Sequence, residues 1–444
     1  MSKPLWRWAL LAVAALLLVA GAGWLYGRYV VETLPPVERA PTGGGPRSYA
    51  AAIERADAVL IGAAALARDH PREWLFQERL ANAHIARARL KGDFGDYAAA
   101  QSALARAFAI AAPGAGPHQA QLALAMAMHR LGQAEAMAAA IDHYAVRPEI
   151  EDLIELRLVR GGLAFYRGDV AGALARYRAA GAEPNDSRLA LRLAELDART
   201  GKGDEALALI DTVERGARLP NAQFLADLAL RRGAIALRAG DRTAAARQFD
   251  RAMRLFPGWW LAEAHRAQVD ALDGRMVEAT AAFERIARRS NSPEAMDALA
   301  SLRRAAGDPV GARRWAAQAG AIWAERLRLF PEAAAGHAAE HALAFGDPKR
   351  ALALARADAA ARPYGLPRTT LALALIANGD PASALAVLGP AFASGWVSAD
   401  ARMAASQALL LLGRAEEAEH ARDAALAIDS HAGDESAALF WFGH

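Results

Sequence analysis

Two histidines and one glutamate near residue 340 are the residues whose spacing most suggests a reaction. The segment reads His337-Ala-Ala-Glu340-His341. On a helix, side chains four residues apart lie on one face, so His337 and His341 could share a zinc ion while Glu340 serves as a base. A third protein ligand is also needed, and the sequence does not place one. This metal chemistry is therefore the remote alternative among the functions considered below.

Two further groups of side chains could bind a partner. Basic residues stand just before glycines that end helices: His129-Arg130, Arg199, Arg238 and Arg304. They could attract acidic partners, but cations at helix C-termini are also stabilised by the helix dipole, and we favour that interpretation. Tryptophans at 259, 260, 315 and 323 are possible binding hot spots, although tryptophan is more often packed in a core. Neither group identifies a ligand.

Composition excludes several classes of protein. The 444 residues include no cysteine, which rules out disulfides, thiolate metal sites and a cysteine nucleophile. The formal charge is +3, and the basic side chains are interleaved with acidic ones, as on a solvated helix surface. We therefore expect no nucleic-acid partner. No glycine-rich phosphate loop or serine elbow occurs, so we expect no cofactor and no enzymatic activity.

The chain is organised by a repeated helical hairpin, for which Arg231 to Trp260 is the model. Ala245, Phe249 and Ala252 follow i, i+4, i+7 spacing and share one helix face. Pro257 then ends the helix. A turn glycine recurs at intervals of 36, 33, 39, 34, 33, 39, 33 and 34 residues, at Gly132, Gly168, Gly201, Gly240, Gly274, Gly307, Gly346, Gly379 and Gly413.

Small residues keep phase with these glycines. Seven residues before each glycine stand Ala125, Gly161, Ala194, Gly233, Ala267, Ala300, Ala339, Ala372 and Ser406. Five residues after it stands an alanine in every copy but the first, which has Met137. Ala339 is one of these packing positions, so we interpret His337, Glu340 and His341 as incidental surface residues of a repeat.

The repeat resembles the tetratricopeptide repeat (TPR), whose period is about 34 residues. The glycine or alanine of the first helix, the alanine of the second, and the aromatic at Tyr177, Phe249 and Phe283 match that family, whereas its first-helix tryptophan and tyrosine are mostly missing. The resemblance covers residues 74–430. It implies an all-α fold, a right-handed α-solenoid of TPR-like hairpins, because one hairpin cannot bury both its faces and needs neighbours.

The resemblance also implies a function. Stacked TPR hairpins form a concave groove that receives a peptide or helix of a partner protein. Family geometry places Met126, Phe165, Glu195, Ala234, Gln268 and Ser301 in that groove. Two aromatic residues of the C-terminal tail, Phe440 and Trp441, could also dock on a partner, or the tail could cover the last repeat.

An apolar segment at the N-terminus predicts a membrane anchor. Leu5 to Tyr26 is about 33 Å of helix, enough for a hydrocarbon core of about 30 Å, and aromatic residues stand near both its ends. A cleaved signal peptide, with cleavage near Ala20-Gly21-Ala22, is the alternative and would give a secreted soluble protein. We favour a retained single-pass anchor in a bacterial inner membrane, with the repeats in the periplasm.

These observations predict four regions. They are an anchor at 1–30, a proline- and glycine-rich linker at 31–48, the solenoid at 49–430 and an apolar tail at 431–444. Extra length near Arg215–Leu219 and Ala321–Leu327 predicts longer loops or extended helices. The predicted function is a membrane-anchored scaffold that binds other proteins and assists assembly of a membrane or envelope complex.

Overall fold

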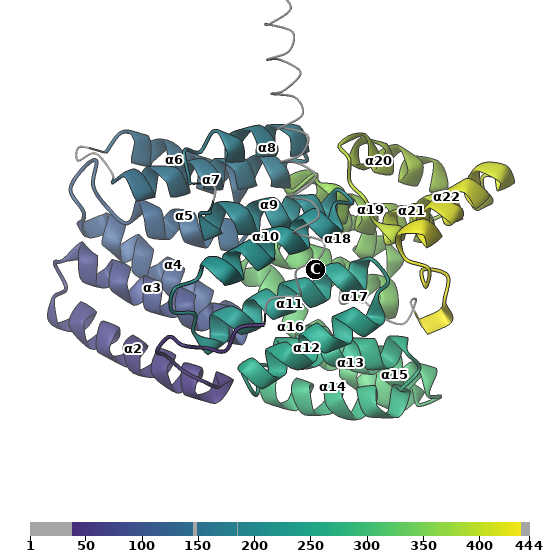
Figure 1. Ribbon diagram of the computed structural model, residues 1–444, viewed down its shortest axis with the longest axis horizontal. Coiled ribbons are helices and arrows are strands. Elements are labelled where there is room, and N and C mark those ends of the chain that lie inside the picture. Colours follow the sequence, from purple (N-terminus) through teal and green to yellow (C-terminus); the bar gives the residue numbers. More distant parts are fainter. Residues whose placement is uncertain (1–37, 145–148, 184, 437–444) are drawn as a thin grey trace, which may run out of the picture. The chain divides into compact units, whose positions relative to one another are not determined.

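The protein is all-helical in the part that the structure describes. The computed structural model describes residues 38–144, 149–183 and 185–436, and these hold α-helices and no strand. Helices follow one another in chain order as stacked hairpins within residues 40–444 (Figure 1). The expected all-α architecture of TPR-like hairpins is confirmed, and its right-handed sense stays a prediction.

The described residues form the following helices, in chain order. They are α2 (Tyr49–Asp69), α3 (Trp74–Lys91), α4 (Phe94–Ile110), α5 (His118–Ala127), α6 (Leu131–Asp142), α7 (Ile150–Tyr166), α8 (Val170–Arg178), α9 (Ser187–Arg199), α10 (Gly203–Gly216), α11 (Ala222–Arg238), α12 (Arg242–Leu255), α13 (Trp260–Leu272), α14 (Met276–Ser290), α15 (Pro293–Ala305), α16 (Pro309–Leu329), α17 (Pro331–Phe345), α18 (Pro348–Ala361), α19 (Gly365–Ala377), α20 (Pro381–Ala393), α21 (Ala399–Leu411) and α22 (Ala415–Ile428).

The hairpin formed by α11 and α12, which represents the repeat, shows why the small positions recur. Gly233 faces the ring of Phe249 so closely that an added Cβ would lie 2.4 Å from it. Phe249 is therefore fully buried against the partner helix. Gly240 adopts the left-handed conformation with φ +77°, which glycine allows at no steric cost. Asp241 then caps α12 by accepting the amide of Ala244 at 2.7 Å.

The first copy of the repeat has a different register from the one expected. Gly132 lies inside α6, and the turn is made by His129, a non-glycine residue with φ +54°. Counting five residues from His129 gives Ala134, which is fully buried, rather than Met137. The mismatch at Met137 therefore came from assigning the turn to a glycine when a histidine makes it.

The two long intervals have different structural causes. Near Ala321–Leu327 the extra length extends α16, which has 21 residues. Near Arg215–Leu219 it falls on the end of α10 and on the connection to α11. The turn between α3 and α4 is short, because α3 ends at Lys91 and α4 begins at Phe94 with Asp93 as its cap.

The N-terminal anchor, Leu5 to Tyr26, lies outside the described residues. No helix among those described is both long and apolar enough to cross a bilayer. The linker is described from residue 38, and at Gly43 it packs against the chain instead of forming a free joint. The amide of Gly43 donates to the carbonyl of Pro220 at 3.0 Å, and an added Cβ would collide with the carbonyl of Leu219.

Segments far apart in the sequence are in contact, because the stack turns back on itself. Gly168, in the α7–α8 turn, lies so close to Pro363 that an added Cβ would be 2.7 Å from its carbonyl oxygen. The α9–α10 turn repeats this contact: the amide of Val397 donates to the carbonyl of Arg199 at 2.9 Å. An added Cβ at Gly201 would be 3.5 Å from that of Val397.

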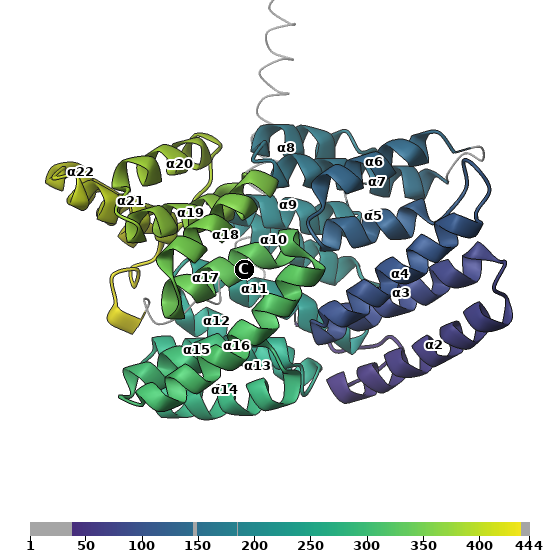
Figure 2. The same cartoon turned by 180° about the vertical axis from the view of Figure 1, so that it is seen from behind.

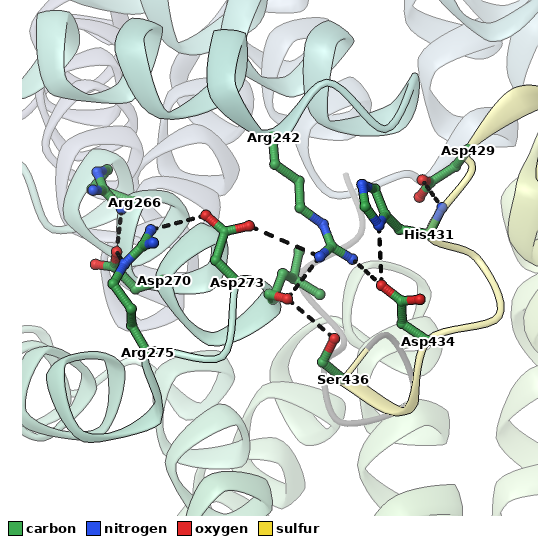
Figure 3. A network of polar contacts seen from close by, with 10 residues as sticks. Arg242, Arg266, Asp270, Asp273, Arg275, Asp429, His431, Asp434 and Ser436 are labelled. Carbon is green, nitrogen blue, oxygen red and sulfur yellow. Dashed lines mark hydrogen bonds and ion pairs between the residues drawn. The ribbon is translucent and has the colours of Figure 1, made fainter.

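The same pattern continues on either side. Arg130, in the α5–α6 turn, pairs with Glu332, 202 residues away, and lies over the ring of Phe330 at 4.8 Å. After α22, the segment 429–436 takes the corresponding place beside α12. Arg242 donates to Asp434 at 3.2 Å, and both Arg242 and Ser436 donate to the carbonyl of Leu272 (Figure 3).

We call these contacts the seam. On one side it comprises residues 128–130, 168, 199–201 and 240–242, and on the other residues 329–332, 362–364, 396–397 and 429–436. Figure 2 shows the helices of both sides, α5 to α9 and α17 to α21, from behind. The seam places the α18–α19 connection against the first helices of the N-terminal hairpins.

Candidate functional site

Three of the predicted groove residues line one half-open cavity of about 830 Å³. The first helices of three successive hairpins, α5, α7 and α9, supply most of its walls, and Arg231 of α11 adds to them. Tyr364 adds a wall from the seam. We call this space the inner cavity.

The floor of the inner cavity is apolar. Met126 and Leu122, one helical turn apart on α5, face Val159 on α7. Gly162 also lines the cavity, and an added Cβ there would make ordinary contacts, 3.6 Å from the Met126 methyl group and 3.8 Å from the Tyr177 hydroxyl. A larger side chain at residue 162 would therefore take up part of the cavity beside Met126.

The rim of the inner cavity is charged and largely paired. Arg192 on α9 donates to Glu155 on α7 at 2.5 Å, and Arg199 donates to Glu195 at 2.7 Å. The Arg192–Glu155 pair joins two successive first helices, whereas the Arg199–Glu195 pair lies within α9. An apolar floor with a charged rim is the arrangement that suits an amphipathic segment.

Glu195 keeps its charge in this setting. Burial by itself would raise the pKa of Glu195, but the positive charges of Arg199 and Arg238 outweigh it and lower the pKa to about 2. Its side chain is 42 % exposed, so water still reaches the carboxylate. Glu195 is therefore an anion at neutral pH that a partner's cation or amide can contact.

Aromatic side chains close the end of the cavity at the seam. The ring of Tyr364 packs 5.5 Å from Phe165 and 5.4 Å from Tyr166, measured between centroids. Trp396 completes the cluster 5.6 Å from Tyr364. Burial raises the pKa of the Tyr364 and Tyr166 phenols, so both remain hydrogen-bond donors at neutral pH.

The predicted groove residues fall into three groups. Met126, Phe165 and Glu195 line the inner cavity together. Ala234 is half-buried on α11 and does not line it. Gln268 and Ser301 are only 7 % and 1 % exposed, and neither lines the inner cavity.

The burial of Gln268 has a clear cause. Its amide oxygen contacts the Nδ1 of His265 at 3.2 Å inside the stack. Phe440 and Trp441 lie outside the described residues. Partner contact by any of these residues stays a prediction.

The histidines of the H-x-x-E-H segment are held by different carboxylates. Nδ1 of His337 lies 2.9 Å from Glu340, and Nδ1 of His341 lies 2.7 Å from Asp297 on α15. Trp323 donates to the same Asp297 at 2.8 Å. The space beside them is about 20 Å³, room for one water molecule.

No trio of His, Asp or Glu side chains in the described residues is arranged to hold a metal ion. Burial alone would lower the pKa of His337, but the Glu340 carboxylate outweighs it and raises the pKa. Burial raises the pKa of Asp297 despite its hydrogen bond from His341. These pairs join α17 to α15 and α16, and we assign no reaction to them.

The arginines that precede turns also make contacts within the chain. Arg199 lies over Trp396 at 5.4 Å, and Arg304 donates to the carbonyl of Ala344 at 2.8 Å. The seam is the main feature that sequence analysis missed. The sequence does show that turns within hairpins and connections between hairpins recur with the same period. That period does not tell which turn contacts which connection.

Comparison with known proteins finds similar chains among solved structures. No family model and no curated protein matches the chain. A tetratricopeptide repeat protein from Parabacteroides merdae ATCC 43184 is 17 % identical, with 58 % of this chain and 99 % of that chain covered and a TM-score of 0.34. Yeast Tom70 is 14 % identical, with 87 % and 96 % covered and a TM-score of 0.35.

A third solved structure is PilW, described as a widely conserved type IV pilus biogenesis factor. It is 16 % identical, with 47 % of this chain and 92 % of that chain covered and a TM-score of 0.32. At such identities and TM-scores these neighbours carry no argument about function. The description of the fold rests on the hairpins themselves.

Proposed function

We propose that this protein is a scaffold that binds a segment of another protein in the inner cavity. The observation that supports this most is the apolar floor of Met126, Leu122 and Val159 beneath a rim of paired charges. An amphipathic helix or a short extended peptide would place apolar side chains on that floor and polar ones at the rim.

The scaffold is anchored in a bacterial inner membrane by Leu5 to Tyr26, with the repeats in the periplasm, and it assists assembly of a membrane or envelope complex. The length and apolar character of that segment support this part of the proposal. A reporter fused to the C-terminus tests the side of the membrane. Sequencing the N-terminus of the mature protein tests retention, because cleavage would leave a chain that begins near Gly23.

The binding proposal is tested by filling the cavity from its floor. Gly162→Leu places a side chain in the cavity, in contact with Met126 and the Tyr177 hydroxyl, without backbone strain because Gly162 lies within α7. We expect recovery of the partner by cross-linking from membranes to fall by about tenfold or more, equivalent to roughly 1.4 kcal/mol of binding free energy.

The matched control is Gly62→Leu in α2. Gly62 also lies within a helix, and nothing lies within 4 Å of its added Cβ. Both substitutions replace a helix-interior glycine by a better helix former. Equal partner recovery from the two variants would contradict binding in the inner cavity.

A further inference from the structure

Tyr364 belongs both to the inner cavity and to the seam. It lines the cavity, yet it lies on the connection between α18 and α19, far along the chain from α5, α7 and α9. The cavity is therefore complete only when the two sides of the seam are in contact. Any separation of the seam would remove this wall.

The seam near the cavity is made by connections rather than by packed helices. Arg362 donates to the Nδ1 of His129 at 2.8 Å, and Val397 donates its amide to the carbonyl of Arg199 at 2.9 Å. Arg362 is itself held by Asp358, one helical turn earlier. If the two sides separated, these polar groups would form hydrogen bonds with water in place of the hydrogen bonds that they now make with each other.

Hairpins are joined in a different way. Between α11 and α12, for example, Ala245 and Phe249 are fully buried, and Gly233 allows the helices to touch. Proteins open first where few apolar groups are buried and where backbone hydrogen bonds are isolated. The seam meets this description at its polar contacts, whereas apolar side chains are buried across it around Phe330 and around Phe165, Tyr364 and Trp396.

The seam covers hairpin turns that are bare elsewhere in the stack. An added Cβ at Gly168 or Gly201 would contact the opposite side of the seam. The equivalent glycines Gly274, Gly307 and Gly379 have nothing within 4 Å. Bare turns in the second part of the stack show that the hairpin does not need this cover to form.

We propose that the seam opens and closes while the hairpins stay folded, and that opening at Tyr364 widens the route by which a partner's segment enters the half-open inner cavity. This inference rests on the proposed function for its biological meaning. The opening itself is a property of the isolated chain and is tested without a partner.

The chain offers a direct way to hold the seam shut, because it has no cysteine of its own. In the double variant Gly201→Cys with Val397→Cys, the two Cβ atoms would be 3.5 Å apart, within the range for a disulfide. The control is Gly258→Cys with Tyr49→Cys, where the corresponding distance is 3.8 Å. Both glycines have positive φ, so backbone strain is matched.

The readout is hydrogen exchange at the amide of residue 397. In the unmodified chain, this amide should exchange at least about tenfold faster than the amide of Phe249, which lies in a buried hairpin. Oxidation of the 201–397 pair should slow its exchange by about tenfold, and reduction should restore it. The 49–258 disulfide should leave it unchanged.

Exchange of the residue 397 amide at the rate of Phe249 in the unmodified chain would overturn the proposal, because the seam would then open only with global unfolding. Unchanged exchange after oxidation would also overturn it. Neither result bears on the effect of Gly162→Leu, so failure here is distinguishable from failure of the proposed function.

The route is tested with a single cysteine on the cavity floor, Met126→Cys. Its reaction with a bulky polyethylene glycol maleimide is compared with its reaction with N-ethylmaleimide. Adding Tyr364→Ala should accelerate the bulky reagent by about tenfold and the small reagent much less, because only the bulky one needs the wall removed. Equal acceleration of both reagents would overturn the assignment of Tyr364.

Discussion

At the scale of single residues, the stack holds buried charges that must be neutralised in place. Glu214 is fully buried and accepts from Arg232 at 2.6 Å and from Arg251 at 2.5 Å. The two arginines come from α11 and α12, so one carboxylate joins three consecutive helices. Removing Glu214 takes from the two buried arginines the carboxylate that they share, although Arg232 keeps its ion pair with Asp211 at 2.5 Å.

Glu214→Ala should therefore lower the free energy of unfolding by roughly 3–5 kcal/mol, measured by chemical denaturation. Glu417→Ala is the control, because Glu417 pairs with Arg414 on the surface of α22 and both side chains are about half exposed. That variant should unfold like the parent chain. Similar losses in the two variants would show that the Glu214 group is not the stabilising one.

His265 should make the protein sensitive to mild acid. It is 4 % exposed and stacks on Phe249. Burial lowers its pKa to about 4, although a hydrogen bond from its Nδ1 to the amide oxygen of Gln268 acts in the opposite direction. The unfolded chain, with a pKa near 6.5, binds the proton more readily, so stability is lost as pH falls from about 6.5 to about 4.

The loss attributable to His265 is on the order of 2–3 kcal/mol across that range. His265→Gln, which cannot be protonated, should unfold with a correspondingly weaker dependence on pH. The measurement is the denaturation midpoint at a series of pH values. An unchanged pH dependence in the variant would assign the acid sensitivity to other groups.

At the scale of helices and hairpins, the small positions were predictable because they obey a local rule. A glycine or alanine must face the second helix, and an aromatic such as Phe249 fills the space that remains. The limits of α2 were also predictable, since Ser48 caps the helix by accepting from Ala51. The turn at His129 was not, because sequence patterns assign left-handed turns to glycine.

A matched pair of glycine substitutions tests the packing rule. Gly233→Ala would place its Cβ 2.4 Å from the Phe249 ring and should cost roughly 1–3 kcal/mol of stability, despite the better helix propensity of alanine. Gly62→Ala, with no neighbour within 4 Å, should instead gain about 0.5–1 kcal/mol. The measurement is the free energy of unfolding of each variant. An increase in stability in both variants would contradict the claim that Gly233 is needed for packing against Phe249.

At the scale of the whole chain, the sequence predicted the type of architecture and only part of the candidate site. Met126, Phe165 and Glu195 line one cavity on successive first helices, because a repeat period transfers positions from hairpin to hairpin, and their contact with a partner stays a prediction. Gln268 and Ser301 were placed by the same rule, but they are buried where side chains fill the stack.

Tyr364 could not be assigned to the cavity from sequence at all. Its contact with Phe165 depends on how far each hairpin is rotated relative to the last, and small rotations accumulate over many repeats. The same accumulation determines that Arg130 meets Glu332 rather than another residue. A local sequence pattern does not determine the total rotation over many repeats, so these long-range contacts are known only from the three-dimensional structure.

The measurement that tests the central claim most directly is site-specific photo-cross-linking from the floor of the inner cavity in intact cells. A photoreactive residue at Met126 should join one partner protein through a defined segment, and Gly162→Leu in the same chain should abolish that product. A photoreactive residue at Ile61, which is 71 % exposed on α2, should not give the product. The same product from both positions, or its persistence with Gly162→Leu, would contradict binding in the cavity.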